Sequence, residues 1–213
     1  MDNETKKIAK ELANKIIKAV SPAVREYAGT ELGGTEIKIG ADGTPTSYID
    51  QIAEEKIVNI LKNADVLSYL ISEEVGELKL GKGTKRIIKL TQELKRTDLS
   101  EEETPKFIFL IDPIDGTSNA IKEIPAYAIS IAIAEVNQGR LATINDVELG
   151  FVYNLANGNF IEAEKGKGCH LNNEPLTPST NVQINKMTLG GFTKSGTSEA
   201  SKLVDRARRM RVL

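Results

Sequence analysis

The sequence predicts a mixed α+β fold. Two helical periodicities fill most of the first 63 residues, whereas residues 107–192 are dominated by strand patterns. Helices and strands that occur in separate runs are typical of the α+β class. The continuous apolar segment 107–111 is the strongest strand signal in the chain and predicts the buried centre of a sheet. With 213 residues, the chain is long enough to bury a sizeable core.

Two helices are expected before the first buried strand. Apolar residues recur at three- and four-residue steps over 5–29, which is the spacing of one helical face. Ser21-Pro22 interrupts this pattern, either as a kink or as the start of a second helical segment. The glycine-rich stretch 30–45 should be a hairpin or a loop, and a second helix should run from about Ser47 to Asn63.

Strands account for most of the remaining chain. Residues 65–72 predict a buried strand, and the lysine- and glutamate-rich stretch 77–105 predicts a mobile excursion with a hairpin or short helix. Asn157-Gly158 is typical of a tight hairpin turn. Further strands are expected at 128–134, 148–154, 159–164 and 186–192, and a last helix at 197–209.

The composition excludes several classes of function. Lys and Arg number 28 against 30 Asp and Glu, so the formal net charge of −2 lacks the basic excess of a nucleic-acid-binding protein. Cys169 is the single cysteine, which excludes an intramolecular disulfide and a thiolate zinc site and indicates a reducing, cytoplasmic setting. No apolar segment has the length or position of a membrane span or a signal peptide.

Acidic side chains follow two of the predicted strands. Glu73 and Glu74 come after the strand 65–72, and Asp112 and Asp115 come after the apolar strand 107–111. If the two strands are neighbours, four carboxylates meet at one sheet edge, where open α/β sheets bind ligands. Such a cluster repels itself unless a cation is present. Oxygen ligands without His or Cys favour Mg²⁺ over Zn²⁺.

The residues after Asp115 suit an anionic ligand. Gly116 and Thr117 precede a short helical turn expected through Ser118 to Lys122. Free backbone N–H groups at the start of a helix attract phosphate. A cation at the carboxylates and a phosphate at these amides together describe a metal-assisted phosphoester hydrolase, in which two cations hold the attacking water and the leaving oxygen.

The same patterns also have purely structural explanations. The segment 112–116 is rich in turn-forming residues, and the pair Glu73-Glu74 would suit a solvated strand end. Asp50 stands three residues after Ser47, where it would complete a capping box. The residue patterns alone leave these explanations open.

Asp112-Pro-Ile-Asp-Gly-Thr117 after an apolar strand resembles the signature of the inositol monophosphatase family. That family belongs to the Mg²⁺-dependent, lithium-sensitive phosphatases, which include the fructose-1,6-bisphosphatases. The acidic pair Glu73-Glu74, the helix start over 46–54 and the strand–hairpin segment over 150–172 are also similar to the family, although the helix start contains one extra residue. The segment 40–45 resembles archaeal members, some of which act on both inositol phosphate and fructose 1,6-bisphosphate.

The resemblance implies a layered α/β/α/β/α sandwich and a role for each matching residue. Glu73, Asp112 and the carbonyl of Ile114 would hold a first Mg²⁺, and Asp112 and Asp115 a second, with Glu74 as a further candidate. Asp50 and Thr117 would orient and deprotonate the attacking water, and the amides of Gly116 and Thr117 would hold the phosphate. Two or three Mg²⁺ ions are implied, with Mn²⁺ as a substitute.

The resemblance also implies an extent and a set of partners. Family members continue through a Gly-Ser strand, a helix and a Trp-Asp-x-Ala-Ala-Gly motif that supplies another Asp ligand. We therefore expect a fragment, in which a domain over 1–193 carries the metal site and 194–213 begin a second domain. The resemblance implies a homodimer in the cytoplasm that acts on a small phosphorylated sugar or inositol. It implies no nucleic-acid partner and no membrane association.

The favoured function is a Mg²⁺-dependent phosphomonoester hydrolase acting on inositol 1-phosphate, fructose 1,6-bisphosphate or both, without a covalent enzyme intermediate. Two alternatives stay open. A nucleotide phosphatase of the 3′-phosphoadenosine 5′-phosphate type is mildly favoured by the long segment 75–111. A non-catalytic metal- or phosphate-binding regulator is favoured by the missing Asp.

Overall fold

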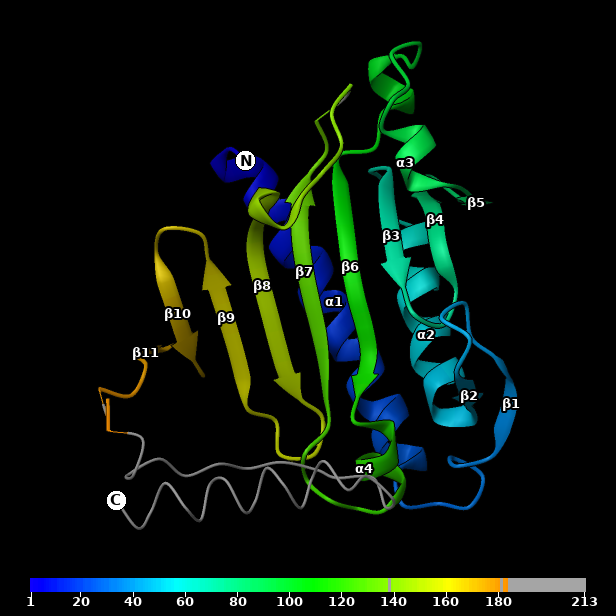
Figure 1. Ribbon diagram of the computed structural model, residues 1–213, viewed down its shortest axis with the longest axis vertical. Coiled ribbons are helices and arrows are strands. Elements are labelled where there is room, and N and C mark those ends of the chain that lie inside the picture. The colour runs from blue at the N-terminus through cyan, green and yellow to red at the C-terminus, as the bar shows by residue number, and fades with distance from the viewer. Residues whose placement is uncertain (138, 181, 184–213) are drawn as a thin grey trace. The chain divides into compact units, whose positions relative to one another are not determined.

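The computed structural model describes residues 1–137, 139–180 and 182–183 (Figure 1). Residues Met1–Leu176 form one compact unit, and a second unit begins at Thr177. The expected domain boundary between 193 and 194 lies outside the described residues, as do the strand expected at 186–192 and the helix expected at 197–209.

Two long helices pack on one face of a large sheet (Figure 1). The first, α1 (Asn3–Tyr27), continues through Pro22 without the expected interruption. A proline inside a helix removes one backbone hydrogen bond, and here the buried apolar face of α1 continues on both sides, with Val20 and Val24 fully buried. The second helix, α2 (Tyr48–Lys62), begins directly after Ser47, as predicted.

The sheet has nine strands in the order β11-β10-β9-β8-β7-β6-β3-β4-β5. Within it, β3 and β6 run parallel, with Ser72 opposite Ile111, and the other paired strands of the described sheet are antiparallel. The two strands that precede the acidic residues are therefore neighbours, and their carboxyl ends lie at the same edge. The strands are β3 (Ser68–Ser72), β4 (Gly76–Gly81), β5 (Thr84–Ile87), β6 (Phe107–Asp115), β7 (Ala128–Glu135), β8 (Val147–Asn154), β9 (Phe160–Glu164), β10 (Gly168–Leu171) and β11 (Glu174–Leu176).

Short elements connect these strands and helices. The glycine-rich stretch forms the expected hairpin, from β1 (Glu36–Ile39) and β2 (Pro45–Ser47). A short helix, α4 (Thr117–Ile121), follows β6. The remaining helical turns are α3 (Leu90–Glu93), η1 (Glu101–Glu103) and η2 (Ile144–Asp146).

The stretch 77–105, expected to be an excursion with a hairpin or short helix, contains the hairpin β4–β5 and the short helix α3, and the hairpin extends the sheet. Leu78 and Leu80 of β4 are almost wholly buried in the main core. Lys79 is only 8% exposed, and its ammonium group donates to the carbonyl of Glu103 at 2.7 Å. This contact joins the two ends of the stretch, because Lys79 lies near its start and Glu103 near its end. The aliphatic part of the lysine side chain is buried, while its charged group reaches a backbone acceptor.

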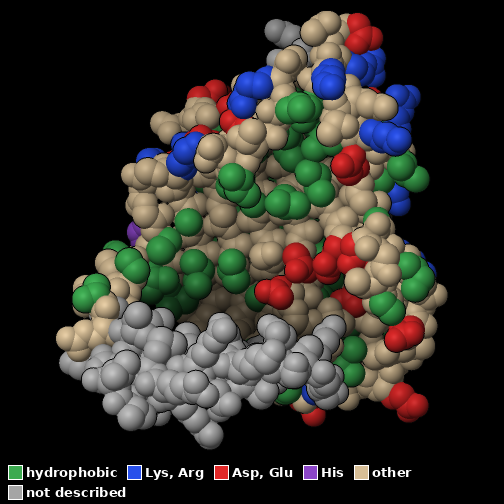
Figure 2. Space-filling view, in the orientation of Figure 1, with side chains coloured by type: hydrophobic (Ala, Val, Ile, Leu, Met, Phe, Trp, Pro, Cys, Tyr) green, Lys and Arg blue, Asp and Glu red, His purple; other side chains and the backbone are tan. Residues whose placement is uncertain are grey.

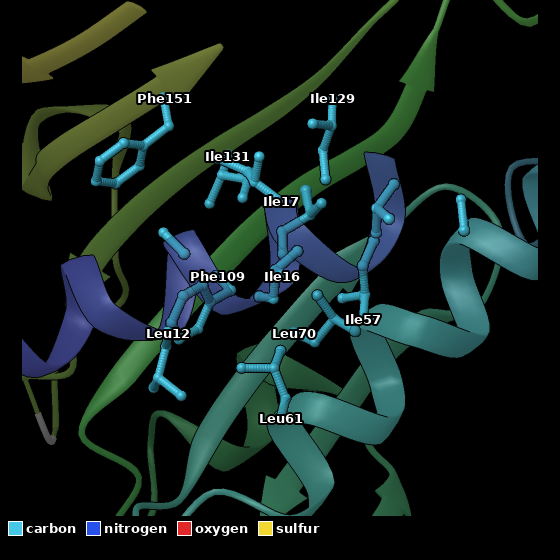
Figure 3. Close-up of a cluster of buried hydrophobic side chains, with 14 of the residues drawn as sticks. Leu12, Ile16, Ile17, Ile57, Leu61, Leu70, Phe109, Ile129, Ile131 and Phe151 are labelled. Carbon is cyan, nitrogen blue, oxygen red and sulfur yellow. The ribbon is translucent and has the colours of Figure 1, made fainter. Parts of the chain in front are cut away.

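The main core lies between the helices and the sheet (Figure 3). Leu12 and Ile16 of α1 and Ile57 of α2 pack against strand residues such as Phe109 and Ile131. Because side chains alternate along a strand, the neighbour Leu110 points away from this core and is 45% exposed. The α+β class is confirmed, and no helix of the described residues is long and apolar enough to cross a membrane.

Candidate metal and phosphate site

The acidic residues gather where β3 and β6 end. Ser72 is the last residue of β3, and Glu73 and Glu74 follow directly. Strand β6 continues through Asp115, beyond the end expected near 111, but its pairing with β7 shifts register between Asp112 and Asp115. The Asp112 carboxylate accepts the backbone N–H of Ile114 at 3.1 Å inside this irregular segment.

Glu73 and Asp112 line the same groove, and each carboxyl group affects the pKa of the other. Burial, and then the charge of Asp112, raise the pKa of Glu73 to about 7. Burial, and then the charge of Asp115, raise the pKa of Asp112 to about 6. Asp115 itself is exposed and acts on Asp112 by its charge. A carboxyl pair with raised pKa values is a site at which a cation would restore both negative charges.

The carboxyl pair lies at the end of a groove over the face of the sheet opposite α1 and α2. The groove has a volume of about 560 Å³, and Glu73 and Asp112 line it together with apolar side chains such as Leu110 and Val152. Figure 2 shows Asp and Glu side chains gathered beside this hollow, with hydrophobic side chains elsewhere around it. A ligand in the groove would therefore meet the carboxyl pair and an apolar floor.

Asp50 joins the site from the first turn of α2. It is 5% exposed, and its two oxygens have different partners. Oδ2 accepts the hydroxyl of Ser47 at 2.6 Å and the backbone N–H of Ser47 at 3.1 Å, which is a capping-box arrangement. Oδ1 accepts the hydroxyl of Thr117 at 2.7 Å. The capping explanation is therefore correct, and the same residue also contacts the expected catalytic threonine.

Gly116 makes the turn from β6 into α4. Its φ of +92° lies in the left-handed region, and a Cβ at this position would stand 2.7 Å from the carbonyl oxygen of Ala126. Both facts require glycine, because an L-residue is strained at this φ and would collide with backbone. The turn places Thr117 so that its hydroxyl also lies 3.0 Å from the carbonyl oxygen of Ile114. Phosphate binding by the Gly116 and Thr117 amides stays a prediction.

Glu74 makes a buried contact that is separate from the carboxyl pair Glu73 and Asp112. It is 7% exposed and accepts a hydrogen bond from the Thr46 hydroxyl. Burial raises its pKa, and the charges of Asp50 and Asp42 act in the same direction. Asp42, in the loop between β1 and β2, also donates its backbone N–H to the carbonyl of Glu73 at 3.1 Å.

The sequence patterns assigned no role to Asp42 or to Thr46. Asp42 belongs to the stretch 30–45, which predicted a hairpin or a loop, and Thr46 begins the helix start over 46–54, but neither pattern showed where these side chains would lie.

The donor set fits a hard divalent cation. No three Asp, Glu, His or Cys side chains of the described residues are arranged to ligate one ion together. Mg²⁺ is nevertheless commonly held by one or two carboxylates, with waters and substrate phosphate as the other ligands. Glu73 and Asp112 supply that pair, and the main charged neighbours that shift their pKa values are all acidic.

Comparisons with known proteins identify relatives of this chain. The model of the inositol monophosphatase family matches residues 2–211. The fructose-1,6-bisphosphatase/inositol-1-monophosphatase of Methanothermobacter thermautotrophicus is 39% identical over 210 residues, which cover 98% of this chain and 67% of that protein. The bifunctional NADP phosphatase/NAD kinase of Methanococcus maripaludis is 31% identical over 216 residues, which cover 95% of this chain and 34% of that protein.

A solved structure shows the same fold. The IMPase of Thermotoga maritima matches with a TM-score of 0.61 at 19% identity, over 95% of this chain and 65% of that one. The chain thus spans about two thirds of the length of the Methanothermobacter relative and about one third of the Methanococcus relative.

Proposed function

We propose that this chain, which belongs to the inositol monophosphatase family, carries the catalytic site of a Mg²⁺-dependent phosphomonoester hydrolase. The substrates would be inositol 1-phosphate, fructose 1,6-bisphosphate or both, as in the name of the Methanothermobacter relative. The observation that carries the proposal is the pair Glu73 and Asp112 at one groove, together with the hydrogen bond from Thr117 to Asp50.

The carboxylates would hold two or three Mg²⁺ ions. Glu73, Asp112 and the carbonyl of Ile114 are assigned to the first ion and Asp112 and Asp115 to the second, with Glu74 as a further candidate. Bound Mg²⁺ supplies the positive charge that offsets the negative charge of the phosphoryl group. Mn²⁺ would substitute, because it accepts the same oxygen ligands.

Thr117 and Asp50 would handle the proton of the attacking water. The Thr117 hydroxyl donates to Asp50 Oδ1, so its oxygen lone pairs are available to accept a hydrogen bond from water. As the water attacks phosphorus, its proton passes to Thr117 while the Thr117 proton passes to Asp50. Ser47 holds the other oxygen of Asp50, which fixes the orientation of the carboxylate. The phosphate would rest on the amides of Gly116 and Thr117. Its ester oxygen would leave as an alcohol by taking a proton from solvent water, with no covalent enzyme intermediate.

The test is phosphate release by the full-length protein from inositol 1-phosphate and fructose 1,6-bisphosphate, with and without Mg²⁺. We expect turnover that requires Mg²⁺ and falls by at least a hundredfold in Asp50→Asn, as for loss of a general base. Glu55→Gln is the matched control, because Glu55 is an exposed acid on the same helix. Full activity in a chelator would refute the metal assignment, and absence of turnover on every phosphate ester would favour a non-catalytic regulator.

A second candidate is a nucleotide phosphatase. The Methanococcus relative, 31% identical, is a bifunctional NADP phosphatase/NAD kinase, so a phosphorylated nucleotide is a plausible alternative substrate. NADP and 3′-phosphoadenosine 5′-phosphate belong in the same assay. A kcat/KM at least tenfold higher for either nucleotide than for both sugar or inositol phosphates would establish this alternative in place of the first.

A homodimer and a cytoplasmic location complete the proposal. Family membership is their support. Light scattering on the purified full-length protein tests the first, and cell fractionation tests the second.

A further inference from the structure

Helix α2 carries a second buried acid for which the proposed chemistry has no use. Glu54 lies four residues after Asp50 and is only 2% exposed. Its Oε2 accepts the hydroxyl of Ser72 at 2.6 Å. Its Oε1 is buried and has no hydrogen-bond partner among the described residues.

A carboxyl group at this position is costly for the fold. Burial disfavours its ionised form and raises the pKa of Glu54 to about 7. The Ser72 hydroxyl, Lys38 and Lys85 lower this pKa and the charge of Glu74 raises it, so the two lysines do not outweigh the burial. A leucine would occupy similar space without a buried polar group. Positions where a sequence departs from the best packing choice are often functional.

The partner of Glu54 lies directly before the acidic pair. Ser72 is the last residue of β3, is almost fully buried, and is paired with Ile111 on one side and Gly76 on the other. The next residue in the chain is Glu73. The hydrogen bond therefore connects α2 to β3 at the point from which the Glu73 backbone leaves the sheet.

We propose that Glu54 is a positioning residue that fixes the end of β3 through Ser72 and thereby sets how tightly Glu73 binds a divalent cation. This inference rests on the proposed function, because it requires Glu73 to be a cation ligand. Side chains that orient metal ligands commonly change metal affinity about 10–100-fold when they are removed.

The experiment measures Mg²⁺ binding to the full-length protein by isothermal titration calorimetry, so it needs no turnover. Glu54→Leu and Ser72→Ala should each raise the Kd for Mg²⁺ at least about tenfold. The double variant should bind no more weakly than the weaker single variant, because both changes remove the same hydrogen bond. Glu54→Gln should stay within about threefold of the unaltered protein, since an amide oxygen still accepts the Ser72 hydroxyl.

Glu55→Leu is the matched control, because it makes the same change at the adjacent, exposed position of α2. Urea unfolding of each variant separates a loss of positioning from a loss of folding. We expect Glu54→Leu to bind Mg²⁺ weakly although its unfolding midpoint does not fall.

Two results would overturn the inference while leaving the proposed function intact. One is Mg²⁺ binding by both Glu54→Leu and Ser72→Ala within twofold of the unaltered protein. The other is an equal loss of Mg²⁺ affinity in Glu54→Gln and Glu54→Leu, which would show that the hydrogen bond to Ser72 is not the cause. If the unaltered protein binds no Mg²⁺, the proposed function fails, and this inference fails with it.

Discussion

Replacing Glu54 by glutamine should remove a large part of the pH dependence of folding. In the folded chain burial raises the pKa of this carboxyl from 4.5 to about 7. The folded state therefore retains a proton that the unfolded state has already released between these two values. The resulting stabilisation is fully present below pH 4.5 and is lost as the pH rises through about 7.

The magnitude follows from the difference between the two pKa values. A difference of one unit corresponds to about 1.4 kcal/mol. The rise from 4.5 to about 7 therefore makes the free energy of unfolding about 3 kcal/mol lower at pH 8 than at pH 4 through this one residue. Glutamine does not titrate, so this contribution should be absent in Glu54→Gln.

The assay is urea unfolding of the unaltered protein and Glu54→Gln at pH 4, 6 and 8, in the presence of a chelator. The free energy of unfolding of the variant minus that of the unaltered protein should increase by about 3 kcal/mol from pH 4 to pH 8. Glu55→Gln, at an exposed position of the same helix, should show a difference that stays constant. A difference for Glu54→Gln that changes by less than about 1 kcal/mol would show that the buried carboxyl keeps an ordinary pKa.

Three substitutions in the site test the other assignments. Asp112→Asn keeps the shape of the side chain but removes the charge assigned to both cations, so phosphate release at saturating Mg²⁺ should fall below a tenth while circular dichroism stays unchanged. Thr117→Val removes the hydroxyl that donates to Asp50 at 2.7 Å, and kcat should fall about 10²–10⁴-fold with a similar KM; an unchanged kcat would exclude Thr117 from proton transfer. Gly116→Ala should cost about 1–3 kcal/mol in urea unfolding, because of the φ of +92° and the carbonyl of Ala126 at 2.7 Å; an unchanged midpoint would contradict that steric argument.

The strands that carry the carboxylates could be predicted because their signal is local. The continuous apolar segment of β6 and the buried strand before Glu73 stand out in the sequence. The order of the strands is not local information. The expectation that both acidic segments meet depended on β3 and β6 being neighbours, which the parallel pairing of Ser72 with Ile111 establishes.

A hairpin was expected within 77–105, but the sequence did not show that β4 would join the sheet beside β3. The lysines and glutamates of the hairpin hide the strand periodicity, and Lys79 in particular counts as a surface residue in any hydrophobic pattern. In the fold its stem is buried and its charge reaches the carbonyl of Glu103. The same limitation applies to Asp50 and Glu54. Carboxyl groups count as surface residues in a hydrophobic pattern, yet both are buried, because their face of α2 points at the ends of β3 and β6.

Asp50 shows that a structural explanation and a functional one need not compete. A capping box requires one oxygen at the start of α2, and Oδ2 takes that role through Ser47. The cap restrains the rotation of the carboxyl group, so Oδ1 is held toward the Thr117 hydroxyl at 2.7 Å. A general base works best when its orientation is set before the substrate arrives, because less ordering is then needed in the transition state. The helix cap is therefore part of the arrangement that would make Asp50 an effective base.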